Sequence, residues 1–306
     1  MKSTKFGRVL VPFVTPFNEN GDVSYDNFTR LINYAIDKNF LDTVVVTGTT
    51  GEFNTLSTQE RIQLYKTAVK VVNGRFPIIA GTGAASAREA IELTKGAEEA
   101  GIKTVMVVGP YYCKPTQQGI YNYYMEILNN TTADIMIYNI PIFTGVNIEP
   151  ETVGRLVSAS RRFIGIKDES GINPVQIIDY QYAVEGKNDD FVIYNGDDIM
   201  MMPTLACGAA GVVSGGSLLI GDKIKKAFEY YEEGRNDEAL ALYHNAFKLC
   251  RIFGINGRIH PNPMLRAAIE MTSGIEIGFA RTPLDVPTSE EKEALKALLA
   301  DMELLQ

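Results

Sequence analysis

The chain has 306 residues, of which 45% are hydrophobic and 22% charged, a composition that suits one large α/β barrel or two ordinary domains. Its formal net charge of −8 argues against non-specific nucleic-acid binding, and no apolar run approaches the roughly 20 residues of a membrane span. The cysteines Cys113, Cys207 and Cys250 are widely spaced, which argues against a disulfide framework or zinc site. Met1–Arg8 lacks the apolar segment of a secretory leader, so we expect a cytoplasmic protein.

Short apolar segments recur along the chain and predict eight strands. They are continuous apolar runs rather than period-2 alternations, which is typical of parallel strands covered on both faces. The predicted strands are Val9–Val14, Thr43–Val46, Pro77–Gly81, Thr104–Val108, Ile135–Tyr138, Phe163–Lys167, Phe191–Asn195 and Gly211–Val213.

Amphipathic segments between these strands carry helix-boundary signals. Ser57 with Glu60 has the spacing of a capping box, and Ser86 with Glu89 repeats it. Gly101 follows the second of these helices, where a left-handed residue is wanted. The alternation of strands and helices predicts a (β/α)₈ TIM barrel of the α/β class, with a doubly wound open sheet as the alternative.

From Ser217 onward the pattern is almost purely helical. The last three predicted helices exceed what a barrel needs, and no Pro/Ser-rich linker separates them from it. We therefore expect a catalytic barrel at residues 1–233 and a C-terminal helical appendage at 234–306, packed on the barrel. The predicted helices are Asp222–Glu233, Asp237–Phe253, Pro263–Thr272 and Ser289–Leu305.

Lys167 is the first candidate for chemistry. It follows the apolar run Phe163–Ile166, so it should emerge at the carboxyl end of a strand, where such barrels carry their sites. An apolar pocket favours the neutral amine, which can attack a carbonyl carbon. The alternative is a lysine paired with Asp168 or Glu169 at the start of a loop.

A glycine-flanked pair of hydroxyls follows the second predicted strand. Thr49 and Thr50 lie between Gly48 and Gly51. Glycines let backbone N–H groups turn toward a ligand, so this segment can hold an anion such as a carboxylate. A plain tight turn is the alternative.

Five motifs occur in order at successive strand ends: GTTGE at 48–52, PYY at 110–112, YNIP at 138–141, GIKD at 165–168 and GDD at 196–198. Together they resemble the dihydrodipicolinate synthase / N-acetylneuraminate lyase family of Schiff-base aldolases, over about Val9 to Asn262. The resemblance implies a lyase that joins pyruvate or another 2-oxo acid to a lysine and makes or breaks the adjacent carbon–carbon bond. It implies no metal or organic cofactor.

The resemblance also implies roles for single residues. Lys167 matches the imine-forming lysine, Tyr138 the proton-shuttling tyrosine, and Thr49 a proton relay. Tyr112 matches a tyrosine that reaches into a neighbouring subunit's site, which implies a dimer or a homotetramer built as a dimer of dimers. The expected substrate-binding positions are Gly48, Thr50, Gly51, Glu169, Gly196 and Val213.

Two positions depart from the synthase branch. Phe143 stands where the synthases usually carry an arginine, and an apolar ring cannot make a bidentate carboxylate contact. Glu169 stands where sugar-acid aldolases usually carry a threonine; it either accepts hydrogen bonds from substrate hydroxyls or pairs with a nearby base. Phe143 counts against the synthase, and Asp168 directly after Lys167 resembles the pairing in 2-keto-3-deoxy sugar-acid aldolases. We therefore expect a 2-keto-3-deoxy sugar acid or a similar hydroxylated 2-oxo acid as substrate. The alternatives are a dihydrodipicolinate synthase, condensing pyruvate with aspartate semialdehyde, and a non-catalytic sensor barrel that binds a small acid.

The remaining polar candidates have structural interpretations. Asp197 and Asp198 are expected to cap a helix that begins near Ile199, with binding of polyol hydroxyls as the alternative. His260 is expected to be structural or exposed, and Arg281 has no predicted role.

Overall fold

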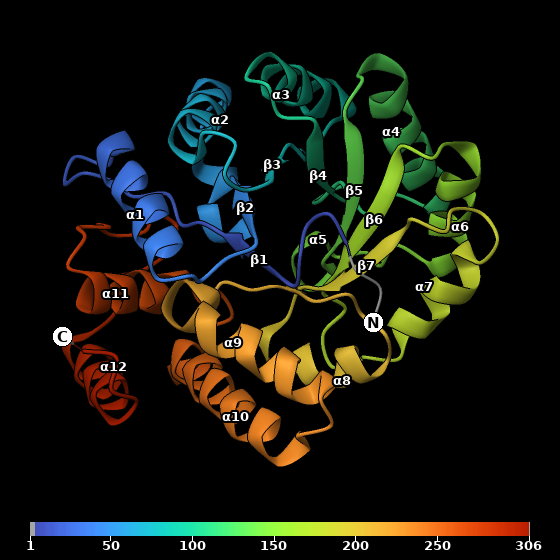
Figure 1. The fold of residues 1–306 in the computed structure, drawn as a ribbon. Coiled ribbons are helices and arrows are strands. Elements are labelled where there is room, and N and C mark those ends of the chain that lie inside the picture. The colour runs from blue at the N-terminus through green and yellow to red at the C-terminus, as the bar shows by residue number, and fades with distance from the viewer. Residues whose placement is uncertain (1–3, 306) are drawn as a thin grey trace.

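Residues 4–305 are described by the structure, a computed structural model. The expectation of no leader concerns Met1–Arg8, whose first three residues lie outside the described part. Eight parallel strands close into a barrel in chain order, with helices on its outside (Figure 1). The (β/α)₈ prediction is confirmed. The strands are β1 (Val9–Pro12), β2 (Thr43–Val46), β3 (Ile78–Gly81), β4 (Thr104–Val108), β5 (Asp134–Asn139), β6 (Phe163–Asp168), β7 (Val192–Asn195) and β8 (Val212–Val213).

Side chains alternate across each short strand and fill two separate cores. In β1, Val9 and Val11 pack outward against the helices, whereas Leu10 points into the barrel. Both faces are therefore apolar, which explains the continuous apolar runs in the sequence. The interior is closed by large side chains such as Met106 and Met136, so the barrel is a packed core and its site must lie at the mouth.

Helices and short 3₁₀ turns connect the strands and cover the outside of the barrel. Their order places one helical layer around the ring of strands (Figure 1). The helices up to β8 are α1 (Tyr25–Asp37), α2 (Thr58–Val72), α3 (Ala87–Glu99), α4 (Gln117–Asn130), α5 (Pro141–Thr144), α6 (Pro150–Ala159), α7 (Gln176–Val184) and α8 (Met201–Ala206), with 3₁₀ turns η1 (Thr49–Gly51), η2 (Phe53–Thr55) and η3 (Asp198–Met200).

The predicted helix boundaries follow the capping chemistry. Ser57 and Glu60 form both halves of a capping box at the start of α2. Ser86 accepts a hydrogen bond from the Glu89 amide at the start of α3. Gly101 has a φ of 94°, the left-handed conformation that ends α3.

The C-terminal helices extend beyond the barrel as expected. They gather on the side of α9 and α1 (Figure 1), and the aliphatic side chains Leu249, Leu265, Leu295 and Leu299 join the same buried core as the barrel helices. The last helix ends four residues before the predicted Leu305, because Glu303 adopts a left-handed φ of 57°. The boundary between residues 233 and 234 stays a prediction. These helices are α9 (Ser217–Glu232), α10 (Asn236–Phe253), α11 (Asn262–Ser273) and α12 (Ser289–Asp301), with the turn η4 (Ile255–Gly257) after α10.

Within residues 4–305, no helix combines the length and the apolar character needed to cross a bilayer.

Candidate active site

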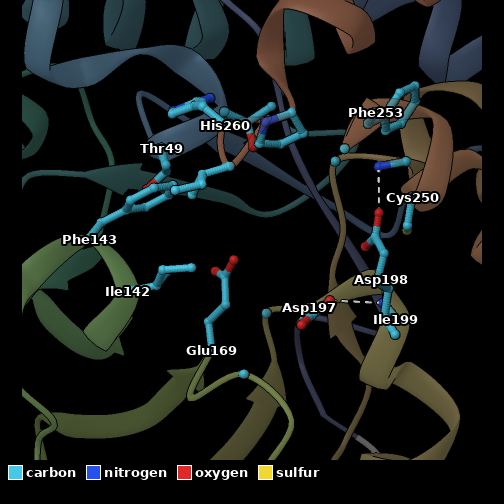
Figure 2. A pocket seen from close by; sticks show the side chains of 18 of the residues that line it. Thr49, Ile142, Phe143, Glu169, Asp197, Asp198, Ile199, Cys250, Phe253 and His260 are labelled. Carbon is cyan, nitrogen blue, oxygen red and sulfur yellow. Dashed lines mark hydrogen bonds between the residues drawn. The ribbon is translucent and has the colours of Figure 1, made fainter. Parts of the chain in front are cut away.

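A cavity of about 690 Å³ opens at the carboxyl ends of the strands, where a barrel of this type carries its site. The barrel mouth forms its floor, and the segment between α10 and α11 forms one wall (Figure 2). Seven of the predicted site residues line it: Thr49, Thr50, Tyr138, Lys167, Glu169, Gly196 and Val213.

Strand register brings Lys167 and Tyr138 together. Lys167 lies opposite Tyr138 of β5 and Tyr194 of β7 in the sheet, so the three side chains point into the barrel at one level. The Nζ atom of Lys167 is 4.0 Å from the centre of the Tyr138 ring. The lysine side chain is only 6% exposed, and what remains exposed faces the cavity. The amine is therefore placed where a carbonyl carbon could reach it.

Glu169 lies beside this amine. Its Oε2 atom is 3.0 Å from Lys167 Nζ and accepts a hydrogen bond of 2.8 Å from the Tyr138 hydroxyl. Residues 167 and 169 share one face because strand side chains alternate, while Asp168 points outward and accepts a hydrogen bond from Asn139. The two interpretations of Lys167 thus both hold: it faces a cavity, and it is paired. The partner is Glu169, not Asp168.

Burial is the main electrostatic influence on this cluster. It raises the pKa of the Glu169 carboxyl, and the charge of Lys167 opposes that rise. Burial also raises the pKa of the Tyr138 hydroxyl far above its ordinary value, with the negative charge of Glu169 acting in the same direction. Tyr138 therefore holds its proton and acts as a donor.

The Thr49 hydroxyl completes a chain of contacts. It is 3.2 Å from the Tyr138 hydroxyl, and because Tyr138 donates to Glu169, Thr49 is the donor to Tyr138. The chain runs from Thr49 through Tyr138 to Glu169 and ends at the Lys167 amine. The proton relay predicted for Thr49 and Tyr138 is geometrically possible, and Glu169 joins it between Tyr138 and Lys167.

In the GTTGE segment the two threonines face the cavity, whereas the two glycines do not. Gly51 N–H is bonded to Gly48 O, and neither glycine lines the cavity. Gly51 packs instead against the Phe13 carbonyl, where a Cβ would come within 3.1 Å. The expected use of the Gly51 amide for a ligand is wrong, because the turn itself consumes that amide. Thr49 and Thr50 are the residues that present this loop to the cavity.

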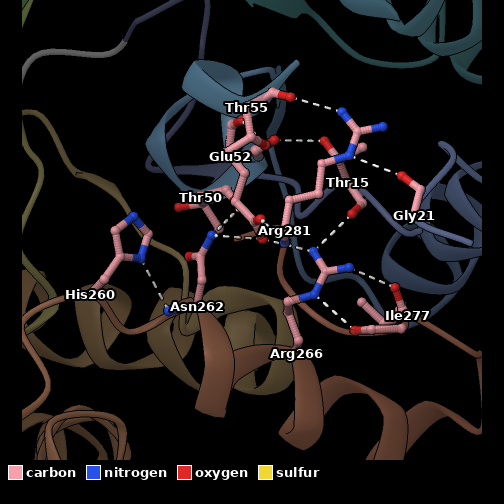
Figure 3. A network of polar contacts seen from close by, with 12 residues as sticks. Thr15, Gly21, Thr50, Glu52, Thr55, His260, Asn262, Arg266, Ile277 and Arg281 are labelled. Carbon is pink, nitrogen blue, oxygen red and sulfur yellow. Dashed lines mark hydrogen bonds and ion pairs between the residues drawn. The ribbon is translucent and has the colours of Figure 1, made fainter. Parts of the chain in front are cut away.

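A buried polar network fixes the GTTGE loop to the C-terminal region (Figure 3). Glu52 is fully buried with a left-handed φ of 55°, and its carboxylate pairs with the Arg266 guanidinium at 2.9 Å. Asn262 donates to the carbonyl of Thr50 and to the Glu52 carboxylate. Burial raises the pKa of Glu52, while Arg266 and these hydrogen bonds lower it. The loop that carries Thr49 is thus held by α11.

Arg281 belongs to the same network, although no role was predicted for it. Its amide donates to Glu52 Oε2 at 3.0 Å, and its guanidinium donates to the carbonyls of Gly21 and Thr55 and pairs with Glu60. The signal available in the sequence was weak: Arg266 stands in the otherwise apolar face of a predicted helix, which indicates a buried partner but does not identify it.

Glycine 196 allows the loop after β7 to lie against the reactive side chains. A Cβ at Gly196 would come within 2.5 Å of Lys167 Cε and 2.9 Å of Glu169 Cβ. The predicted capping role of the next residue is confirmed, because the Asp197 side chain accepts from the Ile199 amide. Asp198 accepts instead from the Gly216 amide and has a pKa raised to about 6 by burial.

Another part of the cavity wall contains the aromatic rings of Phe143 and His260. Phe143 stacks on His260 with ring centres 5.3 Å apart (Figure 2). Burial lowers the pKa of His260 to about 4, so this ring is neutral above pH 5. His260 is a cavity-wall residue and not an exposed one. Arg258, also in this wall, pairs with Glu291 and Asp285.

Tyr112 does not join the site in a single chain. It is 95% exposed, has a left-handed φ of 72° and is absent from the cavity lining. Its predicted relay role would require a second subunit and stays a prediction.

No group of three or more His, Cys, Asp or Glu side chains within residues 4–305 is placed to hold a metal ion.

Comparisons with known proteins point in one direction. Residues 5–302 match the dihydrodipicolinate synthetase family. The chain is 36% identical to a 4-hydroxy-tetrahydrodipicolinate synthase of Bacillus subtilis (strain 168), covering 97% of this chain and 99% of the relative. It is 39% identical to the synthase of that name from Synechococcus sp. (strain JA-2-3B'a(2-13)), covering 98% of this chain and 95% of the relative.

Solved structures agree with the sequence comparisons. A dihydrodipicolinate synthase from Bacillus anthracis superposes with a TM-score of 0.91 at 35% identity, covering 97% of this chain and 99% of that chain. A dihydrodipicolinate synthase from Aquifex aeolicus superposes with a TM-score of 0.90 at 32% identity, covering 98% and 99%. The likeness extends over the barrel and the C-terminal helices alike.

Proposed function

We propose, on the premise that the chain belongs to the dihydrodipicolinate synthetase family and is a lyase, that it binds pyruvate as an imine on Lys167 and condenses it with aspartate semialdehyde. The observation that carries the imine step is the position of the Lys167 amine at the floor of the cavity, within 3.0 Å of Glu169 and against the ring of Tyr138. No metal or organic cofactor is needed for it.

The chemistry follows from the electron-accepting character of a protonated imine. The amine attacks the ketone carbon of pyruvate, the carbonyl oxygen leaves as water, and the nitrogen becomes positively charged. Loss of a proton from the neighbouring methyl carbon then returns the electron pair to nitrogen and gives an enamine. The enamine carbon attacks the aldehyde and forms the new bond. Each step moves at least one proton, so hydroxyl and carboxyl groups beside the nitrogen can act as proton donors and acceptors.

The pyruvate carboxylate is expected at the GTTGE loop. The hydroxyls of Thr49 and Thr50 face the cavity there, and the 3₁₀ turn leaves its first amides without partners inside the turn. A carboxylate can be held in this place without a full positive charge beside Lys167.

The choice of aldehyde rests on the relatives. Those named above are called 4-hydroxy-tetrahydrodipicolinate synthases and align over nearly the whole chain. They favour aspartate semialdehyde, and they do not support the sugar-acid substrate expected from the two departing residues.

One observation keeps hydroxylated 2-oxo acids as a second candidate. Phe143 is stacked on the neutral ring of His260, and Glu169 and Asp197, which line the same pocket, can accept hydrogen bonds from hydroxyls. Position 143 supplies no arginine for a distal carboxylate, and Arg258 of the same wall is already paired with Asp285 and Glu291.

A homotetramer built as a dimer of dimers is part of the proposal. The exposed ring of Tyr112, held by a left-handed backbone outside its own cavity, would be a relay only in the site of a second copy. A monomer in light scattering at working concentration would contradict this arrangement.

Borohydride trapping tests the imine. Pyruvate with borohydride should add mass to the wild-type protein at the peptide that contains Lys167, and Lys167→Ala should lose the adduct while it keeps its circular dichroism spectrum. A wild-type protein that gains no mass would support a non-catalytic barrel that binds a small acid.

Coupled assays with two aldehydes then separate the substrates. A higher kcat/KM with aspartate semialdehyde than with glyceraldehyde supports the synthase, and the reverse preference supports the hydroxylated 2-oxo acids.

A further inference from the structure

We propose that Glu169 is a catalytic residue of this site: its carboxylate takes the proton from the Lys167 amine and later exchanges the proton of the carbon next to the imine. The inference rests on the proposed imine at Lys167 and deepens it. It assigns to a carboxylate the proton transfers that the family resemblance implies for Tyr138.

The contacts of Glu169 are those of a proton acceptor at the reacting nitrogen. Oε2 is 3.0 Å from Lys167 Nζ, within direct proton-transfer distance. The same oxygen accepts the Tyr138 hydroxyl at 2.8 Å, and Thr49 lies 3.2 Å behind Tyr138. Lys167 and Tyr138 both donate to this carboxylate, and Thr49 reaches it only through Tyr138, so Glu169 is the acceptor on which the contacts end.

Glu169 is both buried and reachable. Its side chain is 24% exposed, and that exposed part faces the cavity, where Figure 2 shows the carboxylate projecting between Ile142 and Asp197. A substrate joined to Lys167 would therefore place its carbon atoms against this carboxylate. A purely structural partner of the lysine would not need to line the cavity.

The loop after β7 leaves room for the side chains of Lys167 and Glu169. Gly196 packs so closely that an added Cβ would meet Lys167 Cε at 2.5 Å and Glu169 Oε2 at 2.9 Å. The absence of a side chain at this position lets both reactive groups lie against the loop after β7. A larger residue would push the amine and the carboxylate apart.

Tyr138 is a poor base in this environment. Burial raises the pKa of its hydroxyl well above the ordinary value, and the neighbouring Glu169 charge raises it further. Burial also raises the pKa of Glu169, which makes its carboxylate a stronger base than an exposed one. Among Thr49, Tyr138 and Glu169, only Glu169 has a carboxylate oxygen that can accept a proton directly from Lys167 Nζ, 3.0 Å away.

The steps balance without any further reagent. The ammonium proton moves from Nζ to Oε2, and the neutral amine forms its bond to the ketone carbon. The attacking nitrogen passes one proton to the former carbonyl oxygen, which gives a carbinolamine. The carboxylic acid then returns its proton to that hydroxyl, which leaves as water and gives the protonated imine. The regenerated carboxylate then removes a proton from the methyl carbon, the C–H electron pair becomes the enamine double bond, and the imine electron pair returns to nitrogen.

Several charged or titratable groups surround Glu169, and their titrations must be distinguished from that of Glu169 in a pH–rate profile. From the neighbouring strands come Lys167 and Tyr138, and from the loop after β7 come Asp197 and Asp198. Arg251 comes from the last turn of α10, and Arg258 and His260 come from the segment after it; all three line the same cavity. His260, with a pKa of about 4, stays neutral above pH 5, and Asp198, with a pKa near 6, is the acid that most needs a control.

The test is hydrogen–deuterium exchange at the methyl group of pyruvate in heavy water, followed by proton NMR. This reaction needs imine and enamine formation but no aldehyde, so it does not depend on which aldehyde is used. Glu169→Gln keeps the size and the hydrogen-bond acceptor but cannot accept a proton. We expect its exchange rate to fall at least about 100-fold, in the range usual for loss of a general base.

Two variants control for other effects. Glu270→Gln makes the same change at a half-buried carboxyl of α11 outside the cavity, whose pKa is also raised by burial, and should exchange at the wild-type rate. Glu169→Asp keeps a carboxylate on a shorter side chain and should restore part of the lost rate. The acid limb of the pH–rate profile should vanish in Glu169→Gln and persist in Asp198→Asn.

The outcomes are distinct. If Glu169→Gln, still folded by circular dichroism, exchanges within about threefold of wild type and keeps the acid limb, the carboxylate only positions Lys167 and the inference is wrong. If the wild type itself forms no borohydride adduct with pyruvate, the proposed function fails, and the inference falls with it. A wild type that forms the adduct and a Glu169→Gln variant that forms it slowly and does not exchange would support both.

Discussion

Arg266→Met is predicted to destabilise the protein mainly by leaving a carboxylate buried without its charge partner. Arg266 is 1% exposed and pairs with Glu52, which is fully buried. Its guanidinium also donates to the carbonyls of Thr15, Ile277 and Gly278. Methionine fills similar space but supplies no donor.

The magnitude follows from what Glu52 retains. Without Arg266 it keeps the Asn262 side chain and the Arg281 amide as donors, but no adjacent positive charge at Oε1. Removal of one member of a buried ion pair costs about 3–5 kcal/mol. We expect the free energy of unfolding at neutral pH to fall by an amount in this range.

The loss should depend on pH in a defined direction. Arg266 lowers the pKa of Glu52, which burial already raises, so the variant should have a still higher folded-state pKa. A carboxyl with a raised folded-state pKa holds a proton that the unfolded chain releases, so stability is lost as pH rises above the ordinary value of 4.5. The deficit should therefore be smallest near pH 4 and largest at neutral pH.

Urea unfolding followed by circular dichroism measures this prediction, with a double-mutant cycle as control. Glu52→Gln combined with Arg266→Met removes both charges, and should be more stable at pH 7 than the sum of the two single changes allows, by about 2 kcal/mol or more. Additive single effects, or a loss below about 1 kcal/mol for Arg266→Met, would refute the argument from an uncompensated charge.

Three further predictions concern the cavity. Tyr138→Phe should lower kcat by about 100-fold or more, because Thr49 and Glu169 lose their common hydroxyl, with an unchanged melting temperature as the check on folding. Phe143→Arg should lower the KM for aspartate semialdehyde roughly tenfold through a charge-assisted carboxylate contact, and an unchanged KM would count against a distal carboxylate near this wall. Because burial raises the pKa of Asp198 from 3.8 to about 6, the wild type should lose stability as pH rises through this range, by roughly 1.4 kcal/mol per pH unit at most. Asp198→Asn should not show this loss, and urea denaturation at pH 4 and pH 7 would test the difference.

Local chemistry determined much of the fold. Continuous apolar runs marked the eight strands because each is covered on both faces, and Ser57 with Glu60 marked the start of α2 through a capping box that depends only on neighbouring residues. The position of Lys167 at a strand end followed in the same way. Period-2 alternation also places Glu169 on the same face as Lys167, a relation that the local sequence determines.

Contacts between distant segments decided the rest. Strand register sets Tyr138 opposite Lys167, and the packing of the loop after β7 presses the Glu169 carboxylate against the amine. Arg281 meets Glu52 from 229 residues away, so no local pattern in either segment identifies the other. Sequence periodicity fixes which face a side chain occupies, whereas only the closed barrel and its C-terminal helices determine which side chains from different segments share that space.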